Sequence, residues 1–203
     1  ALDRSIPVPA SHGYSRQQWF NAIGRNFRQL FLLWIISGLR SITHMLLAAF
    51  IPMLIMNRGV NYAGSASWLT ISLFWSMLGM LAGGHLSDMF GKKRMIGISL
   101  FVTTPFLYAF LYTSGPLSLV FLSIGMASLS STIPVGILMA QEAAPSLAGT
   151  ASSMVMGMSV VLGALAASPF GILSDHIGIE RAMNIPLALP ALGILFVLLL
   201  KNE

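Results

Sequence analysis

The stretches GHLSDMFG, residues 84–91, and GILSDHIG, residues 171–178, share five of their eight letters and lie 87 positions apart. The first is followed by Lys92, Lys93 and Arg94, and the second by Ile-Glu-Arg. Two links between helices of similar composition could share this many letters by chance. Repetition with a different charge behind each copy instead favours a duplicated unit whose copies lie in different surroundings.

The composition of the 203 residues indicates a membrane protein. Hydrophobic residues make up 56%, charged residues 8%, and the mean hydropathy is +0.81, whereas soluble domains carry about 25% charged residues. The net charge of +5 would favour nucleic acid in a soluble protein, but here we expect the cations to mark one membrane side and no nucleic-acid partner. The absence of cysteine excludes disulfides and thiolate metal sites.

The polar clusters cut the chain into segments of the length that a membrane helix needs, about 20 residues for a hydrocarbon core roughly 30 Å thick. We predict an all-α membrane protein with six spans, near residues 29–56, 63–83, 95–113, 117–140, 150–173 and 182–200. Residues 1–26 form a polar, basic lead-in or linker, and residues 27–203 form the transmembrane domain. The first span is too long and too far from the N-terminus for a signal peptide.

The cations choose the orientation, because cytoplasmic loops are enriched in Lys and Arg. With the N-terminus inside, eight cations lie on the inner side and two on the outer: Arg4, Arg16, Arg25, Arg28, Lys92, Lys93, Arg94 and Lys201, against Arg58 and Arg181. We therefore expect an integral inner-membrane protein with both termini in the cytoplasm. Three spans separate the octapeptides, so the second lies outside. The chain divides into two inverted three-helix repeats, 27–115 and 116–203.

The segment GHLSDMFGKKR, residues 84–94, resembles the G-x-L-x-D-x-x-G-R/K-R/K-R motif of the major facilitator superfamily. From about residue 79 to 201 the order of features, including AQEAAPS and GILSDHIGIE, resembles the C-terminal half of fosmidomycin-resistance-type efflux proteins. The resemblance implies a six-helix half of a twelve-helix transporter. It also implies proton-coupled export, by alternating access, of a small compound that can be an anion. It also implies drug resistance as a role and a proton antiporter as the mechanism.

The first and fourth spans carry the candidate substrate and proton residues: Arg40, His44, Ser130, Ser131 and Thr132. Arg40 and His44 are four residues apart and share one helix face. A charge within a span is costly, so we expect the two spans to face water or another protein surface, not lipid. Arg40 would bind an anionic substrate group, with His44 as its proton partner. Alternatively, Arg40 bonds to a neighbouring helix and His44 packs.

The first octapeptide and the cations behind it suggest a gate, formed by Gly84, Asp88, Gly91, Lys92, Lys93 and Arg94. Gly84 would let two helices approach, and Gly91 would permit a turn. Asp88 would bind the N-terminus of the fifth span near residues 149–151, where helix N–H groups favour a carboxylate. By symmetry, Asp175 would meet residues 64–67. Each aspartate could instead cap the helix that follows it.

Small residues repeat along two spans and predict close helix packing: Gly79, Gly83, Ser159, Gly163, Ala167 and Gly171. Gln141 and Glu142, at the cytoplasmic end of the fourth span, form either a proton site or a solvated helix end.

No nucleophile–base pair, phosphate-binding glycine loop or metal-ligand spacing is present in the sequence, so we expect no enzyme, no cofactor and no metal. A non-transporting scaffold subunit and an organic-anion uptake system remain as alternatives to export. Half a cavity implies a partner, and we expect a second six-helix half, from a separate chain, an N-terminal segment of the same precursor or a second copy. Membrane lipids, the substrate and protons complete the expected partners.

Overall fold

The computed structural model describes the backbone of residues 16–200 and the side chains of residues 26–200; the first fifteen residues of the predicted lead-in lie outside this range. Six long helices follow one another, with a single 3₁₀ turn, η1 (Pro145–Leu147), before the fifth. They are α1 (Arg16–Asn57), α2 (Tyr62–Phe90), α3 (Lys92–Tyr112), α4 (Pro116–Ala143), α5 (Ala148–Ile177) and α6 (Ile179–Leu198). All six are long and apolar enough to cross a membrane, which confirms the predicted fold class.

Helix α1 begins well before the predicted first span, inside the expected lead-in. It bends at Asn26, whose φ of −121° and ψ of 18° depart from helical values. The Asn26 Nδ2 atom donates a hydrogen bond to the carbonyl oxygen of Ala143 at the end of α4. This bond fixes the start of the membrane-crossing part of α1 against α4.

The octapeptides are helix ends and not the loops that were predicted from the sequence. Helix α2 runs to Phe90 and α5 runs to Ile177, so Gly91 and Gly178 alone separate them from α3 and α6. Both glycines have φ of 84°, with ψ of 141° and 144°. A backbone in this region is open essentially to glycine alone, which explains why each octapeptide ends in that residue.

The two octapeptides also form the same hydrogen bonds. The Gly91 N–H donates to the Ser87 carbonyl oxygen, and the Gly178 N–H donates to the Ser174 carbonyl oxygen, both at 3.0 Å. Each serine hydroxyl donates to the carbonyl oxygen three residues earlier, at 2.7 and 2.9 Å. The sequence repeat is therefore a structural repeat.

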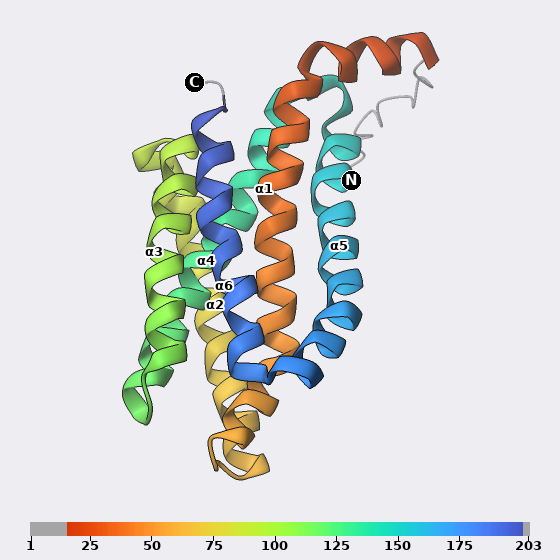
Figure 1. The fold of residues 1–203 in the computed structure, drawn as a ribbon. Helices are drawn as coiled ribbons and strands as arrows, with labels where there is room; N and C mark the ends of the chain where they lie inside the picture. The colour runs from red at the N-terminus through yellow and green to blue at the C-terminus, as the bar shows by residue number, and fades with distance from the viewer. Residues whose placement is uncertain (1–15, 201–203) are drawn as a thin grey trace, which may run out of the picture.

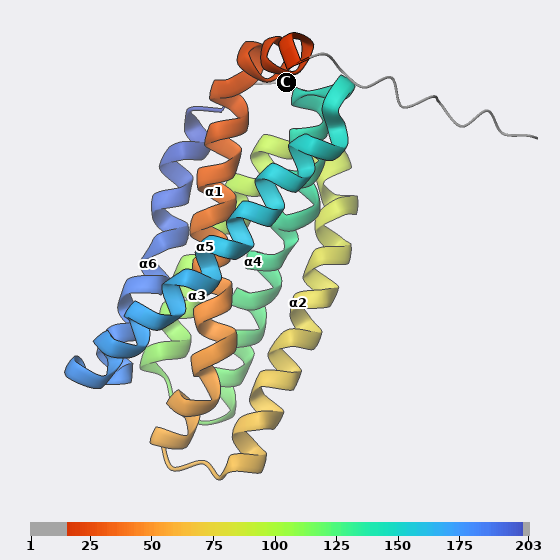
Figure 2. The same ribbon diagram turned by 90° about the vertical axis from the view of Figure 1, so that its right-hand side faces the viewer.

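The helix packing follows the inverted repeat (Figures 1 and 2). Helix α2 packs mainly on α4, as α5 packs mainly on α1, and α3 packs on α4 as α6 packs on α1. Figure 2 shows α5 crossing α1 and α2 running beside α4. We call the end of the bundle that holds Gly91 the Gly91 end, and the opposite end the Gly178 end.

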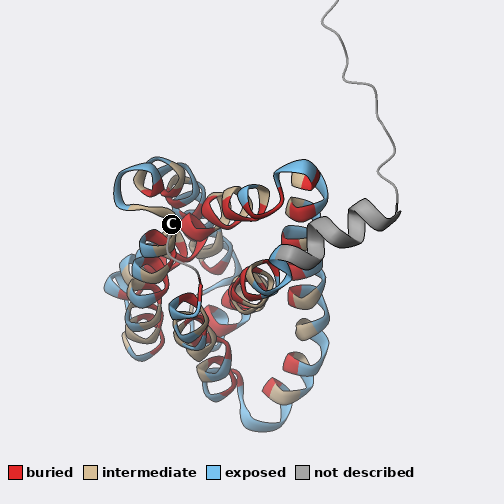
Figure 3. Ribbon diagram, turned by 90° about the horizontal axis from the view of Figure 1, so that it is seen from above, coloured by how far each residue is buried: buried red, intermediate tan, exposed pale blue. Residues whose placement is uncertain are grey.

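Two apolar clusters form the core, one at each end of the bundle. The cluster at the Gly91 end includes Leu33 and Ile96, and the one at the Gly178 end includes Leu54 and Phe110. Viewed from above, the buried residues turn inward and the exposed residues outward (Figure 3). On α1, the polar stretch around Arg40 lies between the two clusters.

Burial agrees with the expectation that the first and fourth spans face water or another protein surface and not lipid. Of the apolar windows of α1 and α4, 44% and 56% are buried, against 44% for α3, 39% for α6 and 22% for α2 and for α5. The physical reason is that α5 lies on α1 and α2 lies on α4 at small-residue contacts. The most exposed of the six helices are therefore α2 and α5.

Candidate substrate site and gating segments

Arg40 is the one charged side chain among the buried polar residues of the described range, with 8% exposure. No hydrogen bond or ion pair joins its guanidinium to another residue within 26–200. His44, one turn further along, is partly buried. Between them, the Thr43 hydroxyl donates to the Pro186 carbonyl oxygen of α6 at 2.8 Å. The helix–helix hydrogen bond in this region thus comes from Thr43, and among the described residues Arg40 has no partner.

The candidate polar residues of α4 are divided between different surroundings. Ser130 is buried and its hydroxyl has no hydrogen-bond partner among the described residues. Thr132 bonds to its own helix, at the Leu129 carbonyl oxygen. Ser131 instead turns toward α3, where its hydroxyl lies 2.8 Å from the Ser99 hydroxyl. Ser130 therefore shares with Arg40 the property of a buried polar group without a partner.

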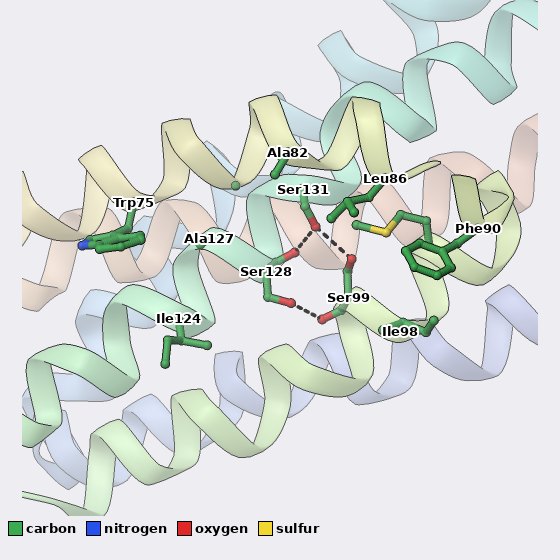
Figure 4. Close-up of a pocket in the computed structure, with 12 residues that line it drawn as sticks. Trp75, Ala82, Leu86, Phe90, Ile98, Ser99, Ile124, Ala127, Ser128 and Ser131 are labelled. Atoms are coloured by element: carbon green, nitrogen blue, oxygen red, sulfur yellow. Dashed lines mark hydrogen bonds between the residues drawn. The ribbon is translucent and has the colours of Figure 1, made fainter. Parts of the chain in front are cut away.

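Ser131 lines a groove between α2, α3 and α4 with a volume of about 440 Å³. Figure 4 shows Ser99, Ser128 and Ser131 linked by hydrogen bonds, with Trp75 and Phe90 at opposite ends of the groove. The Ser128 hydroxyl donates to the Ser99 carbonyl oxygen at 2.8 Å. Ser99 was not among the predicted site residues, because a lone serine in an apolar helix gives no signal until its neighbours are known.

Gln141 and Glu142 make different contacts at the Gly91 end. The Gln141 side-chain amide donates to the Ser152 hydroxyl of α5 at 3.0 Å. Both Glu142 carboxylate oxygens lie 2.8 Å from Lys92 Nζ. Lys92 follows the first octapeptide, so this ion pair ties the α2–α3 connection to the end of α4. Half of the Glu142 side chain is exposed, as a solvated helix end would be.

Asp88 is exposed and borders a groove of about 400 Å³ between α2 and α4, which Gln141 also lines. No hydrogen bond joins Asp88 to the start of α5 within the described part of the chain. The alternative that each aspartate caps the following helix is wrong, since Gly91 and Gly178 hold the cap positions without a side-chain bond. Asp175 is likewise exposed, with no hydrogen bond to residues 64–67 in the described range.

The close approach expected at Gly84 occurs one residue earlier. A Cβ atom at Gly84 would meet nothing within 4 Å, whereas one at Gly83 would lie 2.1 Å from the Ser131 carbonyl oxygen. The reason is that one residue turns the side chain by about 100° around the helix. Gly79 makes an equally close approach, 2.0 Å from the Ala127 carbonyl oxygen.

The other small residues of the predicted stripes pack less tightly. A Cβ at Gly163 would lie 2.9 Å from the Ser41 carbonyl oxygen of α1. Ala167 packs against the core cluster of the Gly178 end, Ser159 is fully buried, and at Gly171 a Cβ would make an ordinary contact of 3.8 Å.

Arg58 forms a contact that sequence reasoning missed. Its guanidinium donates to the carbonyl oxygens of Phe110, Leu111 and Thr113 at the end of α3. It also pairs with Glu180 at 3.2 Å. Arg58 thus joins the end of α1 to α3 and α6. The sequence alone indicates only that Arg58 is one of two cations expected on the outer side of the membrane.

Within the described residues, no group of three or more His, Asp or Glu side chains is placed to hold a metal ion. Three features stand out chemically in the described residues. They are the unpaired polar groups of Arg40 and Ser130, the groove lined by the three hydrogen-bonded serines, and the ion pairs at the two ends of the bundle.

No family model matches the chain. An uncharacterized MFS-type transporter, YfnC, from Bacillus subtilis is 31% identical over 144 residues, which are 71% of this chain and 35% of that protein. The fosmidomycin resistance protein of Escherichia coli is 31% identical over 149 residues, 71% of this chain and 36% of that protein. The chain thus spans well under two thirds of both relatives.

The fold matches a solved transporter as well. A crystal structure of the major facilitator superfamily transporter FucP in the outward conformation superposes with a TM-score of 0.79 at 16% identity, covering 93% of this chain and 46% of FucP. A crystal structure of a variant of FucP, the E. coli fucose:proton symporter, gives a TM-score of 0.74 at 15% identity over the same shares. The repeated octapeptides, the inverted helix packing and these relatives together show that the chain belongs to the major facilitator superfamily and has the fold of one six-helix half.

Proposed function

We propose that this membrane transporter half works in proton-coupled export of a small compound by alternating access, with Arg40 binding an anionic group. The observation that carries the proposal is the buried Arg40 without a partner among the described residues. On insertion scales an Arg at the centre of a membrane helix costs about 2.5–3.5 kcal/mol. A cost of this size is tolerated where the charge serves a ligand that is bound only part of the time.

We include Ser130 of α4 in the same proposal. Its hydroxyl is buried and unbonded within the described range, and buried polar groups without partners are rare in folded proteins. His44 lies on the Arg40 face one turn away. A substrate anion, or water that it displaces, would satisfy these groups.

The proposed cytoplasmic gate is the contact between Asp88 and the N-terminus of α5. Asp88 is exposed in the described arrangement, and Gln141, which lines the same groove, already bonds to Ser152 of α5. A movement of α2 toward α5 would bring the carboxylate to the free N–H groups near residues 149–151. Breaking and forming this contact would alternate access.

We infer that a second six-helix half covers the exposed faces of α2 and α5. Exposed small residues on α5 include Gly149 and Gly157, where a Cβ would meet nothing within 4 Å. Small residues let membrane helices approach closely, so these positions suit another helix. Native mass measurement in mild detergent tests this inference. A substrate-competent species with one copy of this chain and no partner would contradict it.

The decisive experiment replaces Arg40 by Met in the complete assembly, with Arg181→Gln as the control for loss of an exposed cation. The assembly is reconstituted into vesicles with an imposed pH gradient, and radiolabelled fosmidomycin is added as the probe, because one relative is called the fosmidomycin resistance protein. We expect the unaltered assembly to move the probe with the gradient and Arg40→Met to transport at least about tenfold more slowly, since charged hydrogen bonds contribute about 1.5–3 kcal/mol.

Thermal stability separates the site role from the alternatives. Because Arg40 is buried and unpaired, Arg40→Met should raise the melting temperature in detergent. A structural Arg40, bonded to a neighbouring helix, would give a lower melting temperature. A scaffold subunit would tolerate Arg40→Met without loss of its role, and uptake would show as probe movement in the opposite direction.

A further inference from the structure

A third groove, of about 410 Å³, lies between α3 and α6 at the Gly91 end. Figure 1 shows these two helices side by side. Phe101 of α3 and Leu198 of α6 line the groove and are each 69% exposed, so it opens onto the outer surface of the bundle. Lys93 and Arg94, in the first turn of α3, also line it. The groove is thus apolar along its length and has two cations at one end.

The two cations are held differently. Lys93 Nζ donates to the carbonyl oxygens of Leu198 and Leu200, at 3.4 and 2.6 Å, and is thereby fixed at the C-terminus of α6. Arg94 is exposed and has no hydrogen bond or ion pair with another residue in the range 26–200. Its guanidinium can therefore present two parallel N–H groups, the geometry that suits a phosphate.

The inverted repeat supplies an internal comparison at the Gly178 end, 87 residues further along the chain. Arg94 corresponds to Arg181, but Lys93 corresponds to Glu180. Glu180 is paired with Arg58 at 3.2 Å. The equivalent place at the other end of the bundle therefore carries one exposed arginine beside an ion pair, where the Gly91 end carries two adjacent cations.

The apolar part of the groove, around Gly97, also differs from the equivalent place at the Gly178 end. Gly97 corresponds to Asn184, and two tyrosines of α3 cover that asparagine: the Tyr108 hydroxyl donates to its carbonyl oxygen at 3.0 Å, and the Tyr112 hydroxyl lies 2.8 Å from Oδ1. At Gly97 a Cβ would only reach Val197, at 3.6 Å. The groove is filled at one end of the molecule and open at the other.

We propose that the open groove binds one anionic phospholipid. Arg94 binds the headgroup phosphate, and the positive charge of Lys93 beside it adds to the attraction. One acyl chain lies along the groove between α3 and α6, in contact with Gly97, Ile98 and Phe101. Anionic lipids are concentrated in the cytoplasmic leaflet, where juxtamembrane cations attract them. The lipid would complete the surface between α3 and α6 where the equivalent place at the Gly178 end is filled by protein.

Native mass spectrometry of the detergent-purified assembly tests the proposal with phosphatidylglycerol, phosphatidylcholine and inorganic phosphate as probes. We expect one tight phosphatidylglycerol site, weaker binding of phosphatidylcholine, and no displacement of the lipid by phosphate. Arg94→Gln should weaken phosphatidylglycerol binding about fivefold. The control Arg181→Gln, the equivalent exposed arginine at the Gly178 end, should leave binding unchanged.

Gly97→Leu tests the acyl-chain part, because it fills the groove and keeps both cations. It should weaken phosphatidylglycerol binding at least as much as Arg94→Gln does, with circular dichroism confirming that the helices remain. Equal loss in Arg94→Gln and Arg181→Gln, unchanged binding in Gly97→Leu, or displacement by inorganic phosphate would each overturn the lipid site. The readout is binding, so the result does not depend on the proposed transport activity.

Discussion

Three glycines of one helix show how the position on the helix decides what a residue does. Gly79 and Gly83 lie where the α4 backbone approaches α2, and a Cβ at either would overlap a carbonyl oxygen. Gly84 differs by one residue and faces open space. The sequence predicts a small-residue contact on α2 but cannot show which glycine makes it.

This difference predicts opposite effects for the same substitution. Gly79→Ala forces the α4 backbone to move and should lower the free energy of unfolding by about 1–3 kcal/mol, as overpacked sites do. Gly84→Ala meets nothing and removes the conformational freedom of a helical glycine, so it should stabilise by up to about 1 kcal/mol. Melting temperatures of the two variants in the same detergent check both signs. Equal effects would show that α2 and α4 are not in close contact.

At the scale of the elements, cations hold the ends of α3 and α6 in matching ways. Arg58 binds the last carbonyl oxygens of α3, and Lys93 binds those of α6. A helix leaves its last carbonyl groups without intrahelical partners, and positive charge there is favourable. These contacts fix α3 and α6 relative to each other at both ends of the bundle.

Replacing Arg58 should therefore cost more than breaking its ion pair. Arg58→Gln removes several charged hydrogen bonds to the end of α3, each contributing about 1.5–3 kcal/mol in favourable cases. Glu180→Gln removes one exposed pair, which contributes about 0–1 kcal/mol, and Arg181→Gln serves as the unpaired control. We expect the melting temperature to fall most for Arg58→Gln and little for the other two. Equal falls for Arg58→Gln and Glu180→Gln would mean that the ion pair alone matters.

The proposed movement of α2 toward α5 predicts that substitution of Asp88 slows transport without changing stability. Its carboxylate has no partner in the described arrangement, so Asp88→Asn should leave the melting temperature unchanged. Loss of an interaction of about 0.3–2 kcal/mol with the α5 N-terminus should slow transport by about twofold to thirtyfold. Normal transport rates in both Asp88→Asn and Asp88→Ala would rule out the gate.

The positions of the six helices could be predicted from the sequence, because apolar length and polar interruptions are local properties. The helical structure of the octapeptides could not be predicted. Phe90 and Ile177 are still helical, because a single glycine with positive φ makes each turn. The covering of Arg40 by protein could not be predicted either. It depends on packing between α1 and helices far along the chain, as the hydrogen bond from Thr43 to Pro186 of α6 illustrates.

At the scale of the whole molecule, one repeat is used twice in opposite directions, with local changes that give the two ends different chemistry. The octapeptides keep the same turn at both ends, while the residues behind them place Lys93 and Arg94 at one end and Glu180 and Arg181 at the other. We expect this distribution of cations to orient the molecule in the membrane. The fold is symmetric, and its charges are not.

The orientation is testable with equivalent positions of the two repeats. Met89 and His176 lie 87 residues apart, both are exposed, and each precedes the terminal glycine of its octapeptide by two residues. Because the chain has no cysteine, Met89→Cys and His176→Cys each create a single thiol in the same local geometry. We expect a membrane-impermeant thiol reagent added to intact cells to label His176→Cys only, and both variants after the membrane is opened. Labelling of Met89→Cys in intact cells would place the Gly91 end outside and overturn the cation argument, while the shared geometry excludes a difference in local exposure as the cause.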